Sequence, residues 1–480
     1  MTNANAPSNS GASRTCGNRG IALLGGAVLL ASLLTATGVA RAQSAMGPVA
    51  APADDSLTLH GVTLYGIVDI GLQYESHGAP FNDYFPAGSA DIVQKNSNNS
   101  QFGATPSNLS QSRVGLQGIE PILVGDWVAV FKLETFFNPQ SGDIADALKS
   151  LAQNNGRTAS EQTTNLDSSI AGQTFQQSFV GLSSATFGSL TFGRQNTLLA
   201  DGISKYDPQG ASQAFSLIGL SGTTAGGGDT QDRRVDSSLK YVEKVGPVHF
   251  GVDYKFNNAS GAANTLVQAD VGIEYLGASV DAYFTHVRDA ISASALSAAQ
   301  VAMLPGLGLS SSNSLAGTIS DNTSYAIMAM YNFGAPKIYA GYEHIQYANP
   351  TTPLPVGFDD IGGYKLAVVN NTAFPNDKDL QVFWAGVKYT VLSSLDLTAS
   401  YYGYKQNSYA DGANTGCSTT VSGGCSGNEN ALTFSADYRF TKRFDMYAGL
   451  MWTKVSGGLA SGYDFSTDTV DPTIGFRFKF

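Results

Sequence analysis

The last seven residues constrain the fold of this chain most strongly. In Ile474-Gly-Phe-Arg-Phe-Lys-Phe480, the apolar residues share one parity, and Gly475, Arg477 and Lys479 share the other. Successive side chains of a β-strand point to opposite faces, so this strand has one apolar face and one cationic face. Such a closing strand, ending on an outward ring, is unusual in a soluble protein and typical of an outer-membrane β-barrel.

The composition also favours many short strands in a membrane. The 480 residues include 54 Gly, 22 Tyr and 25 Phe but only 17 Pro, and 14% are charged. The mean hydropathy of −0.06 is too polar for a helical membrane protein. Beyond the N-terminal region no apolar run reaches the roughly 18 residues of a spanning helix. A closed barrel needs no such run, because its strands satisfy one another's backbone hydrogen bonds.

Residues 1–42 have the pattern of a cleaved export signal. Arg14 and Arg19 precede an apolar stretch from Ile21 to about Val39, and Ala40-Arg-Ala42 fits cleavage after position 42. A retained helical anchor is the alternative. Loss of the three arginines in this segment changes the net charge from −11 to −14. That acidic balance argues against a nucleic-acid partner, which needs a basic surface.

Alternating apolar and polar residues recur along the remainder of the chain. In the segments 62–75, 248–256 and 432–440, apolar residues occupy mainly one parity and polar residues or glycine the other. In a soluble sandwich the apolar face would form the core. In a large membrane barrel the apolar face turns outward to lipid and the polar face lines the lumen.

The lengths of the connections distinguish these two folds. Short turns are expected near 118–126, 184–187, 244–247, 276–279, 333–336, 391–394 and 440–443. They alternate with longer stretches near 77–101, 139–172, 197–233, 258–265, 291–321, 349–378, 408–429 and 457–468. Seven short and eight long connections join sixteen strands. We therefore predict an all-β fold: a 16-stranded antiparallel transmembrane barrel over 57–480, with short periplasmic turns and long external loops.

The remaining segments are assigned more briefly. Residues 43–56 form a short N-terminal extension, and helices are predicted at 144–153 and 291–303, within loops. Cys417 and Cys425 lie in a polar, glycine-rich stretch, which favours a disulfide closing a surface loop. A metal site is the alternative, but no histidine lies nearby. Enzyme signatures are missing, so the chain is predicted to have no catalytic residue, metal or cofactor.

Several segments carry a resemblance to a known family. Val62-Thr-Leu-Tyr-Gly-Ile-Val-Asp-Ile-Gly-Leu72 resembles the first strand of the general porins of Gram-negative bacteria, especially β-proteobacterial ones. Ser112-Arg-Val-Gly-Leu-Gln-Gly118 is similar to their second strand, and residues 179–195 are similar to their fourth and fifth. The terminal Phe480 matches as well.

The resemblance implies a trimeric pore whose third loop folds inward and faces arginines on the barrel wall. Carried over, the wall residues are Arg113, Arg194 and Arg234; pairing with a rim carboxylate is the alternative for each. Residues 197–233 become the constriction loop, and its acids are Asp201, Asp207, Asp229 and Asp232. The Pro-Glu-Phe-Gly-Gly signature of enterobacterial porins is missing, and Ile67 replaces their first-strand lysine. Which acids line the gap, and the sign of the selectivity, therefore stay open.

The predicted function is passive diffusion of ions and small hydrophilic solutes through a water-filled outer-membrane channel, because sixteen strands enclose an aqueous lumen. A porin that prefers organic anions or sugars is the first alternative, and inward aromatic residues such as Tyr402 and Tyr404 would be needed for sugars. A surface adhesin or a barrel enzyme is the second. Outer-membrane lipid is an expected partner, and the resemblance implies two others: two further copies of the chain, and the barrel-assembly machinery, for which Phe480 would serve as the signal.

Overall fold

The computed structural model describes residues 57–77, 100–122, 124–142, 144, 149–158, 175–220, 233–256, 265–361, 363–412, 424–460 and 468–480. By its contacts the chain divides into two units, 1–43 and 44–480. All of the described residues belong to the second unit. The predicted signal peptide, 1–42, and the extension, 43–56, lie outside the described residues.

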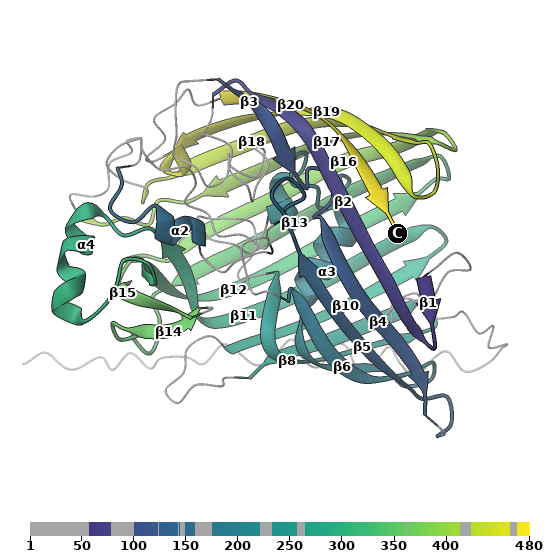
Figure 1. The fold of residues 1–480 in the computed structure, drawn as a ribbon, viewed down its shortest axis with the longest axis horizontal. Helices are drawn as coiled ribbons and strands as arrows, with labels where there is room; N and C mark the ends of the chain where they lie inside the picture. The colour runs from purple at the N-terminus through teal and green to yellow at the C-terminus, as the bar shows by residue number, and fades with distance from the viewer. Residues whose placement is uncertain are drawn as a thin grey trace, which may run out of the picture. The chain divides into compact units, whose positions relative to one another are not determined.

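The described strands form one closed antiparallel barrel (Figure 1). Each strand pairs with its neighbour in the chain, and the last strand pairs with the first. The sixteen barrel strands are β2 (Val62–Glu75), β3 (Gln101–Pro106) together with β4 (Arg113–Pro121), β5 (Val128–Phe136), β6 (Gln177–Ser184), β7 (Gly188–Asn196), β8 (Arg234–Val245), β9 (Val248–Lys255), β10 (Thr265–Tyr275), β11 (Ala278–Ser294), β12 (Ser314–Asn332), β13 (Pro336–Ala348), β16 (Lys378–Leu392), β17 (Leu395–Gln406), β18 (Gly427–Arg439), β19 (Phe444–Gly457) and β20 (Asp468–Lys479). The predicted strand number is confirmed.

Closure depends on the end of the chain. The register places Phe478 opposite Val68 and Phe476 opposite Ile70. The backbone of Phe480 completes the pairing, since its N–H donates to Gly66 O at 3.1 Å and its carbonyl accepts from Gly66 N at 2.9 Å. No barrel edge is left open between the first and last strands, as the sequence of the closing strand predicted.

Apolar side chains face outward, as a membrane barrel requires. On β9, Val252 is 48% exposed whereas its neighbour Asp253 is fully buried. On β18, Leu432 and Phe434 are exposed while Thr433 and Ser435 are buried on the inner face. A polar residue is therefore shielded inside the barrel while its apolar neighbour meets the lipid.

Three local predictions were inexact. The first barrel strand does not begin at residue 57, the predicted start of the barrel: His60 and Gly61 turn with positive φ, and β1 (Leu57–Leu59) folds back on β2. The second barrel strand is interrupted between β3 and β4, both of which pair with β2. The predicted helix 291–303 is strand until Ser294, because β11 continues beyond the membrane on β12.

The external connections hold the remaining described elements. The helices are α2 (Lys149–Gln153), α3 (Leu198–Tyr206), α4 (Ala298–Met303), η2 (Leu217–Leu220), η3 (Leu304–Leu307) and η5 (Gly458–Ala460). A hairpin of β14 (Phe358–Ile361) and β15 (Tyr364–Asn370) was not predicted, and β15 runs parallel to the outer end of β12. None of the helices in the described ranges has the length and apolar character needed to cross a membrane.

Candidate functional site

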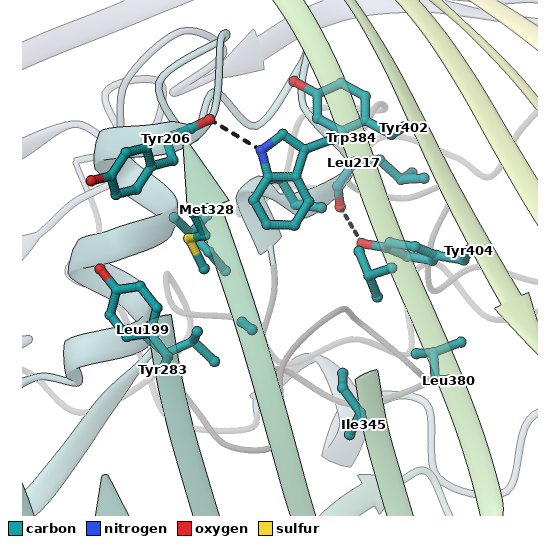
Figure 2. Packing of buried hydrophobic residues seen from close by; sticks show 14 of the residues in the cluster. Leu199, Tyr206, Leu217, Tyr283, Met328, Ile345, Leu380, Trp384, Tyr402 and Tyr404 are labelled. Carbon is teal, nitrogen blue, oxygen red and sulfur yellow. Dashed lines mark hydrogen bonds between the residues drawn. The ribbon is translucent and has the colours of Figure 1, made fainter. Parts of the chain in front are cut away.

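The described part of the connection between β7 and β8, residues 197–220, lies inside the barrel. Its helix α3 contacts β9 to β13, and Leu199, Ile203 and Tyr206 of this helix are buried to 1% exposure or less. They pack with inward residues of several strands, including Met328 and Trp384 (Figure 2). The sequence allows this because α3 is apolar along the side that meets the wall, with Thr197 capping its first turn at Ala200 N.

Three aromatic side chains of the wall hold this loop by hydrogen bonds. Trp384 Nε1 donates to the carbonyl of Tyr206 at 3.1 Å, and the Tyr404 hydroxyl donates to the carbonyl of Leu217 at 3.0 Å, as Figure 2 shows. The Tyr402 hydroxyl donates to Asp207 Oδ1 at 2.5 Å. Because both tyrosines are buried beneath the loop, they anchor it and offer no ring face to a passing solute.

Asp207 is an anchor of the loop rather than a charge exposed to the lumen. Its side chain is 2% exposed and also accepts from the backbone N–H of Gln209 and Ala211 at 3.2 and 2.6 Å. Burial raises the pKa of the Asp207 carboxyl above its usual range, although the bonds from Tyr402 and from these two amides act in the opposite direction. The docked loop therefore binds a proton at this site more tightly than a free aspartate does.

The tip of the loop docks at the interruption between β3 and β4. The carbonyl of Asn108 accepts from Ala214 N and Ser212 Oγ, each at 2.9 Å. Asp69 holds the interruption in place by accepting from the N–H of Leu109 and Ser110 at 3.1 and 2.7 Å. An interrupted strand leaves backbone groups unpaired, and here they become the docking points of the loop.

Two wall glycines provide space for the loop. A Cβ at Gly386 would lie 2.5 Å from Pro208 Cγ, and one at Gly449 would lie 2.7 Å from the Phe215 ring. Both distances are well inside van der Waals contact. Larger residues at these two positions would force the loop away from the wall.

The inner wall formed by β4 and β5 carries positive charge around one buried carboxylate. Glu134 is 1% exposed and lies 3.8 Å from Arg113 Nε and 3.7 Å from Lys132 Nζ. It also accepts from the Tyr65 hydroxyl at 2.9 Å and from Gln177 Nε2 at 3.0 Å. The Arg113 side chain keeps 32% exposure and Lys132 keeps 17%, so both cations reach solvent while Glu134 does not.

Two arginines at the start of β8 extend this positive region. Arg234 lies over the Phe136 ring, 4.7 Å from its centroid, and is 7% exposed. Its Nε and Nη1 are buried without a hydrogen-bond partner. Arg233 donates to the carbonyl of Gly219 at 3.0 Å and to Ser204 Oγ at 3.1 Å, and so connects the wall to the loop.

Asp201 is the predicted loop acid that reaches solvent. Its side chain is 48% exposed and pairs with Lys240 Nζ at 2.9 Å, and it accepts from Asn196 Nδ2 at 2.9 Å. Lys240 also lies opposite the fully buried Asp253 in the register of β8 and β9. We call this group the cationic wall cluster; it comprises Arg113, Lys132, Arg233, Arg234, Lys240, Glu134, Asp201 and Asp253. Five cations face three carboxylates.

Arg194 lies at a β-bulge, where the register of β7 with β8 shifts between Gly193 and Gln195. Its side chain is 18% exposed and pairs with Asp236 Oδ1 at 2.6 Å. The charge of Arg194 acts on the nearby Arg234, as does that of Arg113. The structure thus brings Arg113, Arg194 and Arg234 to one region of the wall, near Asp201.

Other predicted site residues are placed as follows. Asp229 and Asp232 lie outside the described residues, as does Cys417. Cys425 is 3% exposed and disulfide-bonded, but its pairing with Cys417 stays a prediction. The ring of Phe480 covers Gly66, where an added Cβ would lie 2.4 Å from the ring.

The sequence interpretation missed Lys132, Glu134, Arg233 and Lys240. Strand parity could have indicated the first two, since Lys132 and Glu134 alternate with the outward residues Phe131 and Leu133. Lys240 carries the same signal, since it alternates with Leu239 and Tyr241, whereas Arg233 precedes β8 and has none.

Comparisons with known proteins agree with this geometry. The chain is 31% identical over 199 residues to an outer membrane porin protein of Bordetella pertussis. The aligned segment covers 41% of this chain and 43% of that relative. Among solved structures, an anion-selective porin from Comamonas acidovorans has a TM-score of 0.56 at 18% identity, covering 87% of this chain and 99% of that one. A trimer form of OmpT from Vibrio cholerae has a TM-score of 0.52 at 15% identity, covering 87% and 99%.

The family assignment rests on a match along most of the chain. The family model described as Gram-negative porin matches residues 27–458 of this chain. Porins are channels, so the match agrees with the prediction that this protein is not an enzyme. The chain therefore belongs to the Gram-negative porin family, and its place is the bacterial outer membrane.

Proposed function

We propose that this protein forms a water-filled channel for passive diffusion of ions and small hydrophilic solutes, narrowed by the loop 197–233 and favouring anions. The observation that carries the proposal is the loop held inside the barrel together with the cationic wall cluster. Five cations against three carboxylates leave excess positive charge, and the most exposed acid, Asp201, is already paired with Lys240. Selectivity in a channel responds to the charges at its narrow part more than to net charge.

One alternative, sugar-selective diffusion, loses support from the geometry. Sugar-selective diffusion would need exposed aromatic faces, and Tyr402 and Tyr404 are covered by the loop. A wall made of arginine and lysine instead suits carboxylate and phosphate groups, which arginine binds in a planar, bidentate manner. Organic anions are therefore the preferred solutes within the proposal.

The test is planar-bilayer recording in a gradient of KCl. Stepwise conductance is expected, with a reversal potential that indicates anion preference; no stepwise conductance would remove the channel proposal. Arg113→Gln with Lys132→Gln should shift the reversal potential toward cations. Lys388→Gln is the matched control, because this lysine pairs with Asp396 at 3.5 Å outside the cluster and is 37% exposed. An equal shift in the control would remove the cluster from the selectivity mechanism.

We also propose that three copies assemble, that residues 1–42 direct export, and that Phe480 is read by the assembly machinery. A solved structure of similar fold, OmpT of Vibrio cholerae, is described in a trimer form, which supports self-association. Native mass measurement of the detergent-solubilised protein tests the trimer, and sequencing of the mature N-terminus tests cleavage after Ala42. A monomeric mass, or a mature chain that begins at Met1, would contradict these two proposals.

A further inference from the structure

Lys378 lies on the inner face of the barrel, at the external end of β16. In the register of β13 and β16 it stands opposite Tyr347. Two residues further along the strand, Leu380 has no exposed surface and belongs to the buried cluster that includes Leu199 and Tyr206 of the loop (Figure 2). Because alternate residues of a strand share a face, Lys378 and Tyr347 continue the inner wall from that cluster toward the external mouth.

Three aromatic rings gather around the Lys378 ammonium. Its Nζ lies 4.8 Å from the centroid of the Tyr347 ring and 5.9 Å from that of Tyr409, which follows β17. The Phe374 ring contacts both tyrosines, with centroid distances of 6.1 Å to Tyr347 and 5.7 Å to Tyr409. We call these four side chains the mouth cluster. All four residues are partly exposed, so solvent reaches each of them.

Hydrogen bonds hold the two loop segments of the mouth cluster in place. The Phe374 N–H donates to Asn349 Oδ1 at 2.9 Å, and Asn349 Nδ2 donates to the carbonyl of Phe374 at 2.8 Å. The Tyr409 N–H donates to the carbonyl of Gly424 at 2.8 Å, and its carbonyl accepts from the N–H of Asn376 at 3.3 Å. The rings are therefore positioned before a solute arrives, which lowers the entropy cost of binding.

No acid compensates the charge of Lys378 in the part of the chain that the structure describes. The two neighbouring acids lie on the opposite face, where Asp377 Oδ2 accepts from Gln346 Nε2 at 2.9 Å and Asp379 Oδ1 lies 3.5 Å from His344 Nε2. The described contacts of the Lys378 ammonium are with ring faces. An ammonium carries three N–H donors, and here they are available to an anion.

We propose that the mouth cluster binds aromatic carboxylates, with Lys378 pairing with the carboxylate and the three rings packing against the ring of the solute. This inference rests on the proposed diffusion function and names a class of solute within it. An aliphatic carboxylate can use only the charge of the cluster, and a neutral sugar can use only its rings. An aromatic carboxylate uses both. The site concentrates such solutes at the external mouth, apart from the cationic wall cluster around β4, β5 and β8.

Equilibrium dialysis of the folded, detergent-solubilised protein against benzoate tests the site. Benzoate should bind roughly 3- to 10-fold more tightly than cyclohexanecarboxylate, which has the same charge but no aromatic ring. Lys378→Gln should weaken benzoate binding roughly 10-fold or more, because a charge-assisted hydrogen bond is lost. Lys405→Gln is the matched control, since this exposed lysine lies near the external end of β17 between the inward residues Tyr404 and Gln406, and so on the outer face.

The double variant Tyr347→Leu/Tyr409→Leu tests the rings separately and keeps the proposal open to refutation if Lys378→Gln does not fold. It should bring benzoate and cyclohexanecarboxylate to nearly equal affinity. An unchanged preference in this variant, equal binding of the two carboxylates by the unsubstituted protein, or equal losses in Lys378→Gln and Lys405→Gln would overturn the proposal. Methyl glucoside binding as tightly as benzoate would overturn it as well. A protein that conducts ions in a planar bilayer but does not bind benzoate overturns the mouth site alone, whereas missing conductance overturns the diffusion function.

Discussion

The hydroxyl of Tyr402 provides the sharpest test of how the constriction loop is held. Tyr402→Phe removes one hydrogen bond, 2.5 Å long, to the buried Asp207 carboxyl and changes no other atom. A hydrogen bond to a charged group contributes about 1.5–3 kcal/mol. Because about 1.4 kcal/mol is tenfold in an equilibrium, the population of the undocked loop should rise roughly 10- to 150-fold.

Thiol labelling measures that population. Ala431 has no exposed surface and stands opposite Tyr402 in the register of β17 and β18. In an Ala431→Cys background, the rate of maleimide labelling should rise with the undocked fraction. The protein without the added cysteine gives the background, and Cys425 does not contribute to it because it is disulfide-bonded.

The control is the neighbouring tyrosine on the opposite face of the same strand. The Tyr401 hydroxyl donates to Asn430 Oδ1 at 2.7 Å and does not touch the loop. Tyr401→Phe should leave the labelling rate within experimental error. Equal rates in Tyr402→Phe and the unsubstituted background would refute the anchoring role of this hydrogen bond.

The remaining predictions concern pH, the periplasmic end and the disulfide. Burial raises the pKa of Asp207 when the loop is docked, so the docked state binds a proton more tightly than the undocked state. The undocked fraction should therefore fall as the pH is lowered through that raised pKa. The rate of maleimide labelling, corrected at each pH with a free thiol, measures the undocked fraction. Arg477→Gln removes one of the two cations that pair with the buried Asp445; because Lys479 stays at 2.8 Å, the cost should be below the roughly 3–5 kcal/mol of an unpaired buried charge, seen as a lower unfolding temperature in gel-shift assays. Cys425→Ser should leave single-channel conductance intact, because a loop disulfide chiefly restricts the unfolded loop.

Some of the candidate site could be anticipated from the sequence and some could not. The resemblance placed Arg113 and Arg234 on the inner wall, where the structure has them, and it selected the loop that folds inward. It also placed Arg194 there, near Arg234, but the β-bulge at Arg194 and its ion pair with Asp236 could not be read from the motif. A motif fixes the position of a residue along the chain, whereas one residue of register decides which face it occupies.

Asp207 and Tyr402 illustrate the same limit from the opposite direction. The sequence offered Asp207 as a lumen charge and Tyr402 as part of a possible sugar-binding ladder. The structure pairs them beneath the loop, where neither meets the lumen. Their roles depend on contacts between residues 195 positions apart, and no local pattern records such a contact.

What the sequence determined by itself is the barrel. Alternation with a period of two, the lengths of the connections and the apolar face of the closing strand are local properties. A chain with these properties meets lipid on the outside and water on the inside when its sixteen strands form a closed sheet. Only the tertiary structure decided what lines the interior. The position of the loop and the partners of Asp201 and Asp207 arise from packing across the barrel, where distance in space is unrelated to distance along the chain.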